Sequence, residues 1–206
     1  MSFRLDHLVI SSDELTRGRS WVEQVLDIHM GPRGVHEAMG THNHLVALDR
    51  GAYLEVIATD PEAPRPDRPR WFDLDRFNGG PRLTNWVVAC DDLDAALAQA
   101  PDGVGRIMSF TRGPYAWRMA VPDNGVLPFD GGFPALMEWQ SDHPAPALVQ
   151  AGLKLRRLRI THPHATALQQ ALAPFAAALD NVAIVQGERP GMTAELTTPS
   201  GEIWIT

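Results

Sequence analysis

Cysteine and lysine are almost absent from this 206-residue sequence. Cys90 is the only cysteine, which excludes an internal disulfide and a zinc site built from several cysteines. Lys154 is the only lysine, which we interpret as a compositional bias without functional meaning. No apolar run is long enough to span a bilayer, and the N-terminus lacks a signal-peptide pattern. These absences predict a cytoplasmic protein with no membrane partner.

Positive charge is also scarce. The formal net charge is −7 and the pI is near 5.5, which disfavours nucleic acid as a partner because phosphate binding needs a basic surface. The sequence contains no GxSxG elbow, no Walker loop and no Rossmann glycine pattern. Apolar residues make up 44% of the chain, enough for a globular core. A small molecule is therefore the expected partner, with a homodimer left open.

The N-terminal part has the pattern of one compact unit. "RLDHLVI", residues 4–10, alternates like a strand, with Leu5, His7 and Val9 on one face. The following segment, residues 11–26, has helical apolar spacing, and Ser11 with Glu14 suggests a capping box. Two alternating runs, residues 41–48 and 52–58, then predict a hairpin.

This pattern occurs three times. After a proline-rich segment, "RLTNWVVAC" at residues 82–90 starts a second unit, and "LKLRRLRI" at residues 153–160 starts a third. We therefore predict an α+β fold of repeated βαβββ units that form a curved mixed sheet around a cleft. The expected divisions are a first unit over 1–60, a connecting loop over 61–80, a second unit over 81–146, and a third, reduced unit over 147–206 that packs on the others.

Alignment of the first two units pairs polar residues inside apolar strands. "RLDHLVI" on "RLTNWVV" matches His7 with Asn85, and "AYLEVI" on "ALMEWQ" matches Glu55 with Glu138. A buried carboxylate costs several kcal/mol unless it is paired or bound to a metal. We expect these four side chains to converge on one cleft. The alternative for each glutamate is an ion pair with a buried arginine, Arg118 or Arg157.

These segments resemble the glyoxalase-like branch of the vicinal oxygen chelate superfamily, which includes glyoxalase I, extradiol dioxygenases and bleomycin-resistance proteins. The resemblance implies a metal site at His7, Glu55, Asn85 and Glu138 that holds Mn, Fe, Ni or Zn. It also implies that Glu55 or Glu138 moves a proton. Asn85 departs from the usual ligand types, and a buried hydrogen-bonded amide is the alternative for it. The third unit offers no ligands, because Arg157 and Ile205 take the matching positions.

Further residues are candidates for the substrate side of the cleft. His42 and Asn43 lie near the start of a strand, where solvated side chains are the alternative. Tyr115, Trp117 and Met119 share a strand face and could line an apolar pocket. Two others are less distinctive: Arg118, either a substrate contact or a partner for a glutamate, and His143, either an acid–base group or a turn residue. We expect Trp86 and Trp139 to face away from the site.

Two functions remain open at this point. The first is a metal-dependent lyase or isomerase that acts on a small oxygenated carbonyl or hydroxy compound. The second is a metal-free protein that binds or sequesters a small molecule, as bleomycin-resistance proteins do. Arginines that neutralise the glutamates would favour the second function, and free carboxylates facing His7 would favour the first.

Overall fold

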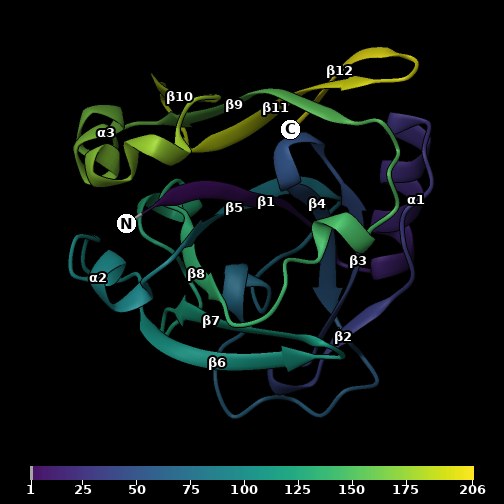
Figure 1. Cartoon of the computed structure of the whole chain (residues 1–206), viewed down its shortest axis with the longest axis horizontal. Helices are drawn as coiled ribbons and strands as arrows, with labels where there is room; N and C mark the ends of the chain where they lie inside the picture. Colours follow the sequence, from purple (N-terminus) through teal and green to yellow (C-terminus); the bar gives the residue numbers. More distant parts are fainter. Residues whose placement is uncertain (1) are drawn as a thin grey trace.

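The structure is a computed structural model that describes residues 2–206. It has an α+β fold dominated by strands, in which one sheet of eight strands curves almost into a barrel, and a second sheet of four strands lies beside it (Figure 1). The strand order is β2-β3-β4-β1-β5-β8-β7-β6 in the first sheet and β10-β9-β11-β12 in the second. The predicted fold class is confirmed.

The first sheet comes from the first two repeats. Its strands are β1 (Phe3–Ser11), β2 (Gly34–His36), β3 (Thr41–Ala47), β4 (Tyr53–Thr59), β5 (Arg82–Cys90), β6 (Arg106–Arg112), β7 (Tyr115–Val121) and β8 (Ala135–Trp139). β1 and β5 pair antiparallel at the centre, and each pairs in parallel with the last strand of its own repeat, β4 or β8. The two repeats are thus related by an approximate twofold axis between β1 and β5.

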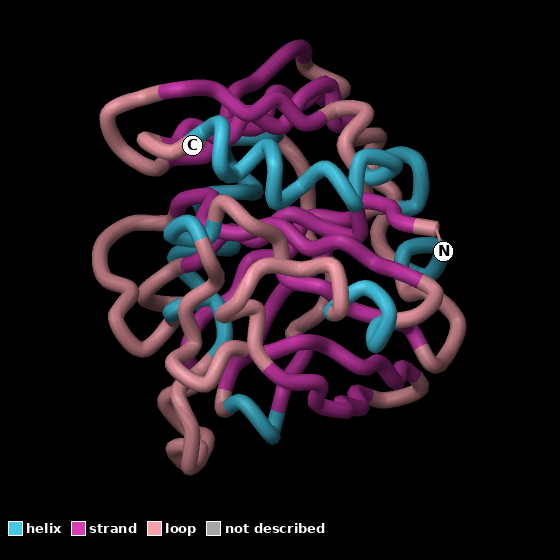
Figure 2. The backbone as a smooth tube through the Cα atoms, turned by 90° about the vertical axis from the view of Figure 1, so that its left-hand side faces the viewer, coloured by secondary structure: helices cyan, strands magenta, loops and turns pink. Residues whose placement is uncertain are grey.

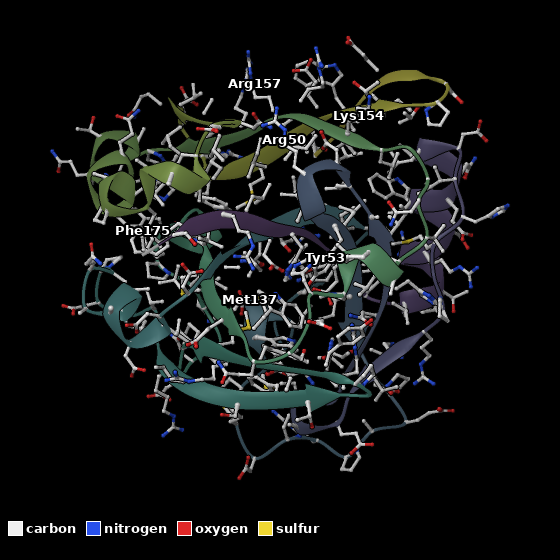
Figure 3. All side chains as sticks on the ribbon, viewed as in Figure 1. Arg50, Tyr53, Met137, Lys154, Arg157 and Phe175 are labelled. Carbon is white, nitrogen blue, oxygen red and sulfur yellow. The ribbon has the colours of Figure 1, made fainter. Side chains whose placement is uncertain are left out.

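The second sheet comes from the C-terminal part of the chain. Its strands are β9 (Lys154–His162), β10 (Val182–Gln186), β11 (Gly191–Thr198) and β12 (Gly201–Ile205). In Figure 2 this sheet forms a separate layer above the first one, with helical segments between them. Phe175 is fully buried between the layers, in edge contact with Phe3 of β1 and Phe133 (Figure 3).

Helices are few. They are α1 (Leu15–Leu26), α2 (Leu93–Leu97) and α3 (Ala165–Leu172), with short 3-10 turns η1 (Glu37–Met39), η2 (Asp49–Gly51), η3 (Trp71–Asp73), η4 (Phe129–Gly131), η5 (Ala145–Ala147) and η6 (Ala173–Ala178). Among residues 2–206, no helix has the length and apolar character that a bilayer-spanning segment needs.

The start of α1 differs from the expected capping box. Ser11 belongs to β1, and the N-cap of α1 is Glu14, which makes no capping hydrogen bond through its side chain. Ser12 Oγ instead donates to the Glu14 carbonyl and closes a turn before the helix. The box pattern failed because β1 continues for one residue beyond the predicted strand.

The curved sheet separates two apolar clusters. Leu8 and Ile10 of β1 belong to a cluster that extends to α1 and to the second sheet. Val9 and Ile57 belong to a cluster inside the curve of the first sheet. Figure 3 shows Tyr53 and Met137 inside this curve, whereas Arg157 lies at the second sheet. The inner face of the first sheet is therefore the place to look for a site.

Candidate functional site

β1 carries a bulge at Asp6. Leu5 pairs with Val88 and His7 pairs with Val87, so Asp6 is an extra residue with no opposite partner on β5. A bulge re-aims the neighbouring side chains, and here both Asp6 and His7 are buried in contact with each other. The expectation that Leu5 shares a face with His7 is wrong, because the bulge breaks the alternation and Leu5 packs against the outer cluster.

Asp6 is the most connected polar side chain of the site. Although it is completely buried, its carboxylate accepts hydrogen bonds from His7 Nδ1 at 2.7 Å, Trp139 Nε1 at 2.8 Å and His143 Nε2 at 3.0 Å. Burial alone would raise the pKa of Asp6, but the bonds from His143 and His7 hold that pKa well below its usual range. Asp6 is therefore a buried anion that orients three rings.

His7 joins Asp6 to Glu55. The second ring nitrogen of His7, Nε2, lies 3.4 Å from Glu55 Oε2, and Asn43 Nδ2 donates to Glu55 Oε1 at 2.6 Å. Burial opposes a charge on His7, but its bonds to the two carboxylates and their negative charges raise the pKa of His7 to about 9. Burial likewise opposes the charge on Glu55, and the bond and charge of His7 outweigh it and lower the pKa of Glu55 to about 2. At neutral pH the two form an imidazolium–carboxylate pair.

Arg112 continues this connection from the second repeat. Its Nη1 donates to Asn43 Oδ1 at 3.0 Å and to His36 Nε2 at 3.3 Å. Burial, together with the Arg112 charge, lowers the pKa of His36 to about 4 despite the opposing charge of Glu55, so this ring is neutral and accepts the bond. A Cβ on Gly34 would collide with Asn43 Oδ1 and lie 2.9 Å from Arg112 Nη1, which explains glycine there. We call Asp6, His7, Glu55, Asn43 and Arg112 the polar chain.

The polar chain borders a narrow cavity on the inner face of the sheet. His7, Glu55, Asn43 and Arg112 line it together with apolar and aromatic side chains. These wall residues are Leu45, Tyr53, Trp71, Phe72, Trp117, Met119, Met137 and Trp139. The cavity holds about 30 Å³, space for one or two waters. A ligand of more than a few heavy atoms therefore needs a wall side chain to turn aside.

Glu138 does not reach this cavity. It accepts a hydrogen bond from Arg118 Nη1 at 3.0 Å and another from the Leu93 backbone N–H, on the α2 side of β8. Register explains the error: Val9 pairs with Glu55 and Val87 pairs with Ala135, so Ala135 holds the position related to Glu55. The expectation that Glu55 and Glu138 converge is not met, and the arginine alternative describes Glu138.

The different burial of Glu55 and Glu138 predicts that their replacement by glutamine lowers the free energy of unfolding by different amounts. We expect Glu138→Gln to lower the free energy of unfolding by about 1 kcal/mol, because its ion pair with Arg118 is partly exposed. Glu55→Gln should cost at least about 2 kcal/mol, because it breaks a buried, charged hydrogen bond to His7. Urea unfolding of both variants measures this difference, and a larger cost for Glu138→Gln would contradict the assigned faces.

The other predicted substrate contacts divide between the cavity and elsewhere. Asn43, Trp117 and Met119 are at the cavity. His42 is not, because its Nδ1 accepts a bond from Arg33 at 3.1 Å and lies 3.7 Å from Asp60.

The remaining candidates lie at or beyond the edge of the cavity. His143 is outside the cavity wall and bonds to Asp6 from a turn before η5. Tyr115 packs beside Trp139, with their ring centroids 6.3 Å apart. Arg118 faces α2, where it also binds Asp94 at 2.6 Å. Asn85 lines a different cavity.

The two tryptophans confirm one expectation and correct the other. Trp86 is fully buried in the outer cluster, as expected, and its Nε1 donates to the Gly132 carbonyl at 3.0 Å. Trp139 was expected on that same outer side but lines the cavity and bonds to Asp6. Glu138 and Trp139 are neighbours on β8, so placing one on the wrong face also misplaced the other.

The predicted four-residue metal centre does not fit these residues. His7 and Glu55 face the cavity and could each offer one ligand atom, but Asn85 and Glu138 point elsewhere. The cavity-facing side chains of the second repeat are Trp117, Met119, Met137 and Trp139, together with the cation Arg112. Within residues 2–206, no group of three or more His, Cys, Asp or Glu side chains is arranged to hold a metal ion. We derive no step through a metal.

Comparison with known proteins identifies the family. The family model described as a glyoxalase-like domain matches residues 5–176. The chain belongs to the glyoxalase-like domain family. The predicted resemblance is thereby confirmed, and this family membership supports a small-molecule enzyme or binder without specifying an activity. No curated protein sequence matches the chain.

Two solved structures are similar to this glyoxalase-like protein. A hypothetical protein from Staphylococcus aureus is 14% identical, with 92% of this chain and 88% of that chain covered and a TM-score of 0.63. Methylmalonyl-CoA epimerase from Mycobacterium tuberculosis is 17% identical, with 70% of this chain and 91% of that chain covered and a TM-score of 0.45. At 14% identity, the likeness to the Staphylococcus aureus protein shows the fold alone.

Three polar residues of the site were missed by sequence reasoning. Strand alternation places Asp6 on the face opposite His7, and the bulge that turns it inward has no sequence signal. His36 lies in a glycine-rich segment that gave no strand pattern. Arg112 ends β6 just before the turn at Gly113 and Pro114, and this position at a hairpin end was the available signal.

Proposed function

We propose that the cavity binds a small, monoanionic carbonyl or hydroxy compound, and that the protein is a small-molecule binder whose binding step needs no metal ion. The observation that carries this proposal is Arg112. Its guanidinium lines the cavity and is bonded only to the neutral groups Asn43 and His36. No carboxylate among residues 2–206 lies within ion-pair distance of Arg112, so an anionic oxygen of a ligand supplies the missing counter-charge.

The other charged side chains in and near the polar chain already have ionic partners. His7 is held between the Asp6 and Glu55 carboxylates, and Glu138 is neutralised by Arg118. With a pKa of about 2, Glu55 is a weak base at neutral pH, whereas efficient general bases have pKa values near the working pH. This pairing favours binding over proton transfer. The aromatic wall gives the apolar part of a ligand a surface to contact.

The direct test compares two arginines of the second repeat. We expect pyruvate, lactate or benzoate to change the fluorescence of the cavity tryptophans Trp71, Trp117 and Trp139. Arg112→Gln should raise the Kd of the bound acid roughly 10–100-fold, because a hydrogen bond to a charged group is worth about 1.5–3 kcal/mol. Fluorescence titration in the presence of EDTA measures the Kd without metal.

Arg118→Gln is the matched control, because Arg118 faces α2 and its charge is paired with Glu138 and Asp94. It should leave the Kd unchanged. An equal loss in both variants would contradict the cavity as the site. Binding that disappears in EDTA and returns with Mn, Fe, Ni or Zn would overturn the metal-independent proposal.

Proton transfer is the second candidate, since Glu55 and His7 face the same cavity as an acid–base pair. An isomerase or lyase of this kind would exchange the C–H protons next to the carbonyl of a bound acid. Proton NMR of pyruvate in D₂O with the protein distinguishes the two functions. Exchange above the buffer rate that is lost in Glu55→Gln would favour the enzyme, and its absence would favour the binder.

A further inference from the structure

β5 carries a bulge that is the counterpart of the one at Asp6. Val9 pairs with Asn85 and Ile10 pairs with Leu83, so Thr84 is the extra residue. The pairs His7–Val87 and Val9–Asn85 lie on either side of the pair Leu8–Trp86. The approximate twofold axis therefore relates the bulged dipeptide Asp6-His7 of the first repeat to Thr84-Asn85 of the second.

A large cavity opens where this second bulge lies. It holds about 500 Å³, within the range of small-molecule pockets and far larger than the cavity at the polar chain. Its walls come from four parts of the chain that are distant in sequence: residues 72–77, β5, the segment 126–132 that includes η4, and strands β9 and β11 of the second sheet. The cavity thus lies between the curved sheet and the C-terminal unit.

Asn85 lies in the wall of this cavity with its amide unused. The residue is 4% exposed, and its side chain makes no hydrogen bond to any of residues 2–206. The amide borders the cavity, so a ligand there can form a hydrogen bond with it. A Cβ on Gly131 would lie 2.9 Å from Asn85 Nδ2, so glycine keeps the space beside this amide free.

Arg82 brings an unpaired positive charge to the same cavity. Its Nη1 donates to the backbone carbonyls of Asn78 and Gly80, and its guanidinium lies 4.0 Å from the centroid of the Phe77 ring. No carboxylate among residues 2–206 lies within ion-pair distance of it. Arg82 is three positions from Asn85 on β5, about 10 Å along a strand.

The other charged side chains at this cavity have hydrogen-bond partners. Arg76 binds Asp73 at 2.7 Å, and Asp130 lies 3.4 Å from His162 Nε2. The apolar side chains of the lining include Phe77, Leu127, Phe129, Ile160 and Met192. A ligand would therefore meet one free cation at the rim, one free amide deep in the wall and apolar surface between them.

We infer that this cavity is a second ligand site, separate from the polar chain, that takes an amphiphilic monoanion. Its acidic group pairs with Arg82, its apolar or aromatic body lies against the phenylalanines, and a carbonyl, hydroxyl or N–H group about 10 Å away bonds to the Asn85 amide. The bulge Thr84-Asn85 thus offers neutral side chains to a ligand, whereas the related bulge Asp6-His7 of the first repeat carries charged side chains.

A pair of dyes tests this site in the intact 206-residue chain. Anilinonaphthalene sulfonate carries an apolar body, an N–H group and one negative charge, and phenylnaphthylamine is its neutral counterpart. We expect the sulfonate to bind at one site, and Arg82→Gln to raise its Kd about tenfold while leaving the Kd of the neutral dye within twofold. Asn85→Asp should weaken the sulfonate more than the neutral dye, because it adds a like charge to the cavity.

Two controls identify the site. Arg156→Gln removes another exposed arginine, on the second sheet at a separate surface, and Arg112→Gln alters the cavity at the polar chain. Neither should change the affinity of the sulfonate. An unchanged Kd in Arg82→Gln, or an equal loss in either control, would overturn the proposal. Arg82 is exposed, so its variant keeps the test decisive even if Asn85→Asp does not fold.

Discussion

Replacing Asp6 by alanine should lower the free energy of unfolding by about 3–5 kcal/mol, the usual cost of breaking a buried ion pair from one side. Without this carboxylate, the His7 imidazolium loses its closest counter-charge, and Trp139 Nε1 and His143 Nε2 lose their acceptor. Much of the cost comes from these stranded donors. Urea unfolding at pH 6 measures it.

Asp123→Ala is the matched control for this experiment. Asp123 is also in an ion pair, with Arg106, but both side chains are more than 70% exposed, so the loss of unfolding free energy should stay below about 1 kcal/mol. A cost for Asp6→Ala as small as that of the control would mean that the buried network contributes little to stability. The loss of unfolding free energy in Asp6→Asn should lie between the losses in these two variants, because asparagine keeps one acceptor oxygen.

The stability of the wild-type protein should fall as the pH rises from about 6.5 to 9. Folding raises the pKa of His7 to about 9, so its contribution is complete below the unfolded-state pKa near 6.5 and is lost as pH rises through the folded-state value. The loss should be on the order of 3 kcal/mol, since one pKa unit corresponds to about 1.36 kcal/mol. Unfolding measured at a series of pH values gives this profile.

His7→Gln should flatten the profile over this pH range, and His29→Gln should leave it unchanged because His29 is exposed. At acid pH the effect of His36 is opposite to that of His7, because stability falls as the pH falls. The pKa of His36 is lowered to about 4, so its contribution is complete above pH 6.5 and is lost as pH falls toward 4. A wild-type profile without a decline above pH 6.5 would contradict the ionic state of His7.

Periodicity was sufficient to predict the repeats and part of the site. The alternating runs that became β3 and β4 were confirmed as a hairpin, and the first strand placed His7 inside the sheet near Glu55. Both predictions depend on local pattern and on strand order, which the hydrophobic spacing of each repeat encodes. The curved sheet followed from the same repeats.

Face assignments failed where the backbone departs from regular geometry. A single extra residue at Asp6 turned a side chain inward, and matching Glu138 to Glu55 by residue type ignored a register that relates Glu55 to Ala135. Because side chains alternate with a period of two, an offset of one or three residues reverses the face. Arg112 reaches the site through a contact with Asn43 across repeats, which no local pattern contains.

The paired bulges also make the fold convenient to engineer. Each repeat carries two consecutive polar side chains at a bulge beside a cavity. One dipeptide is an acid–imidazole pair, and the other carries a hydroxyl and an amide. An acid–imidazole pair could be introduced in the second repeat by substituting Thr84 and Asn85 alone. No change of backbone is needed, because both strands already have the bulge. One scaffold thus offers two interchangeable positions for designed ligand or catalytic groups, set back to back across its central strand pair.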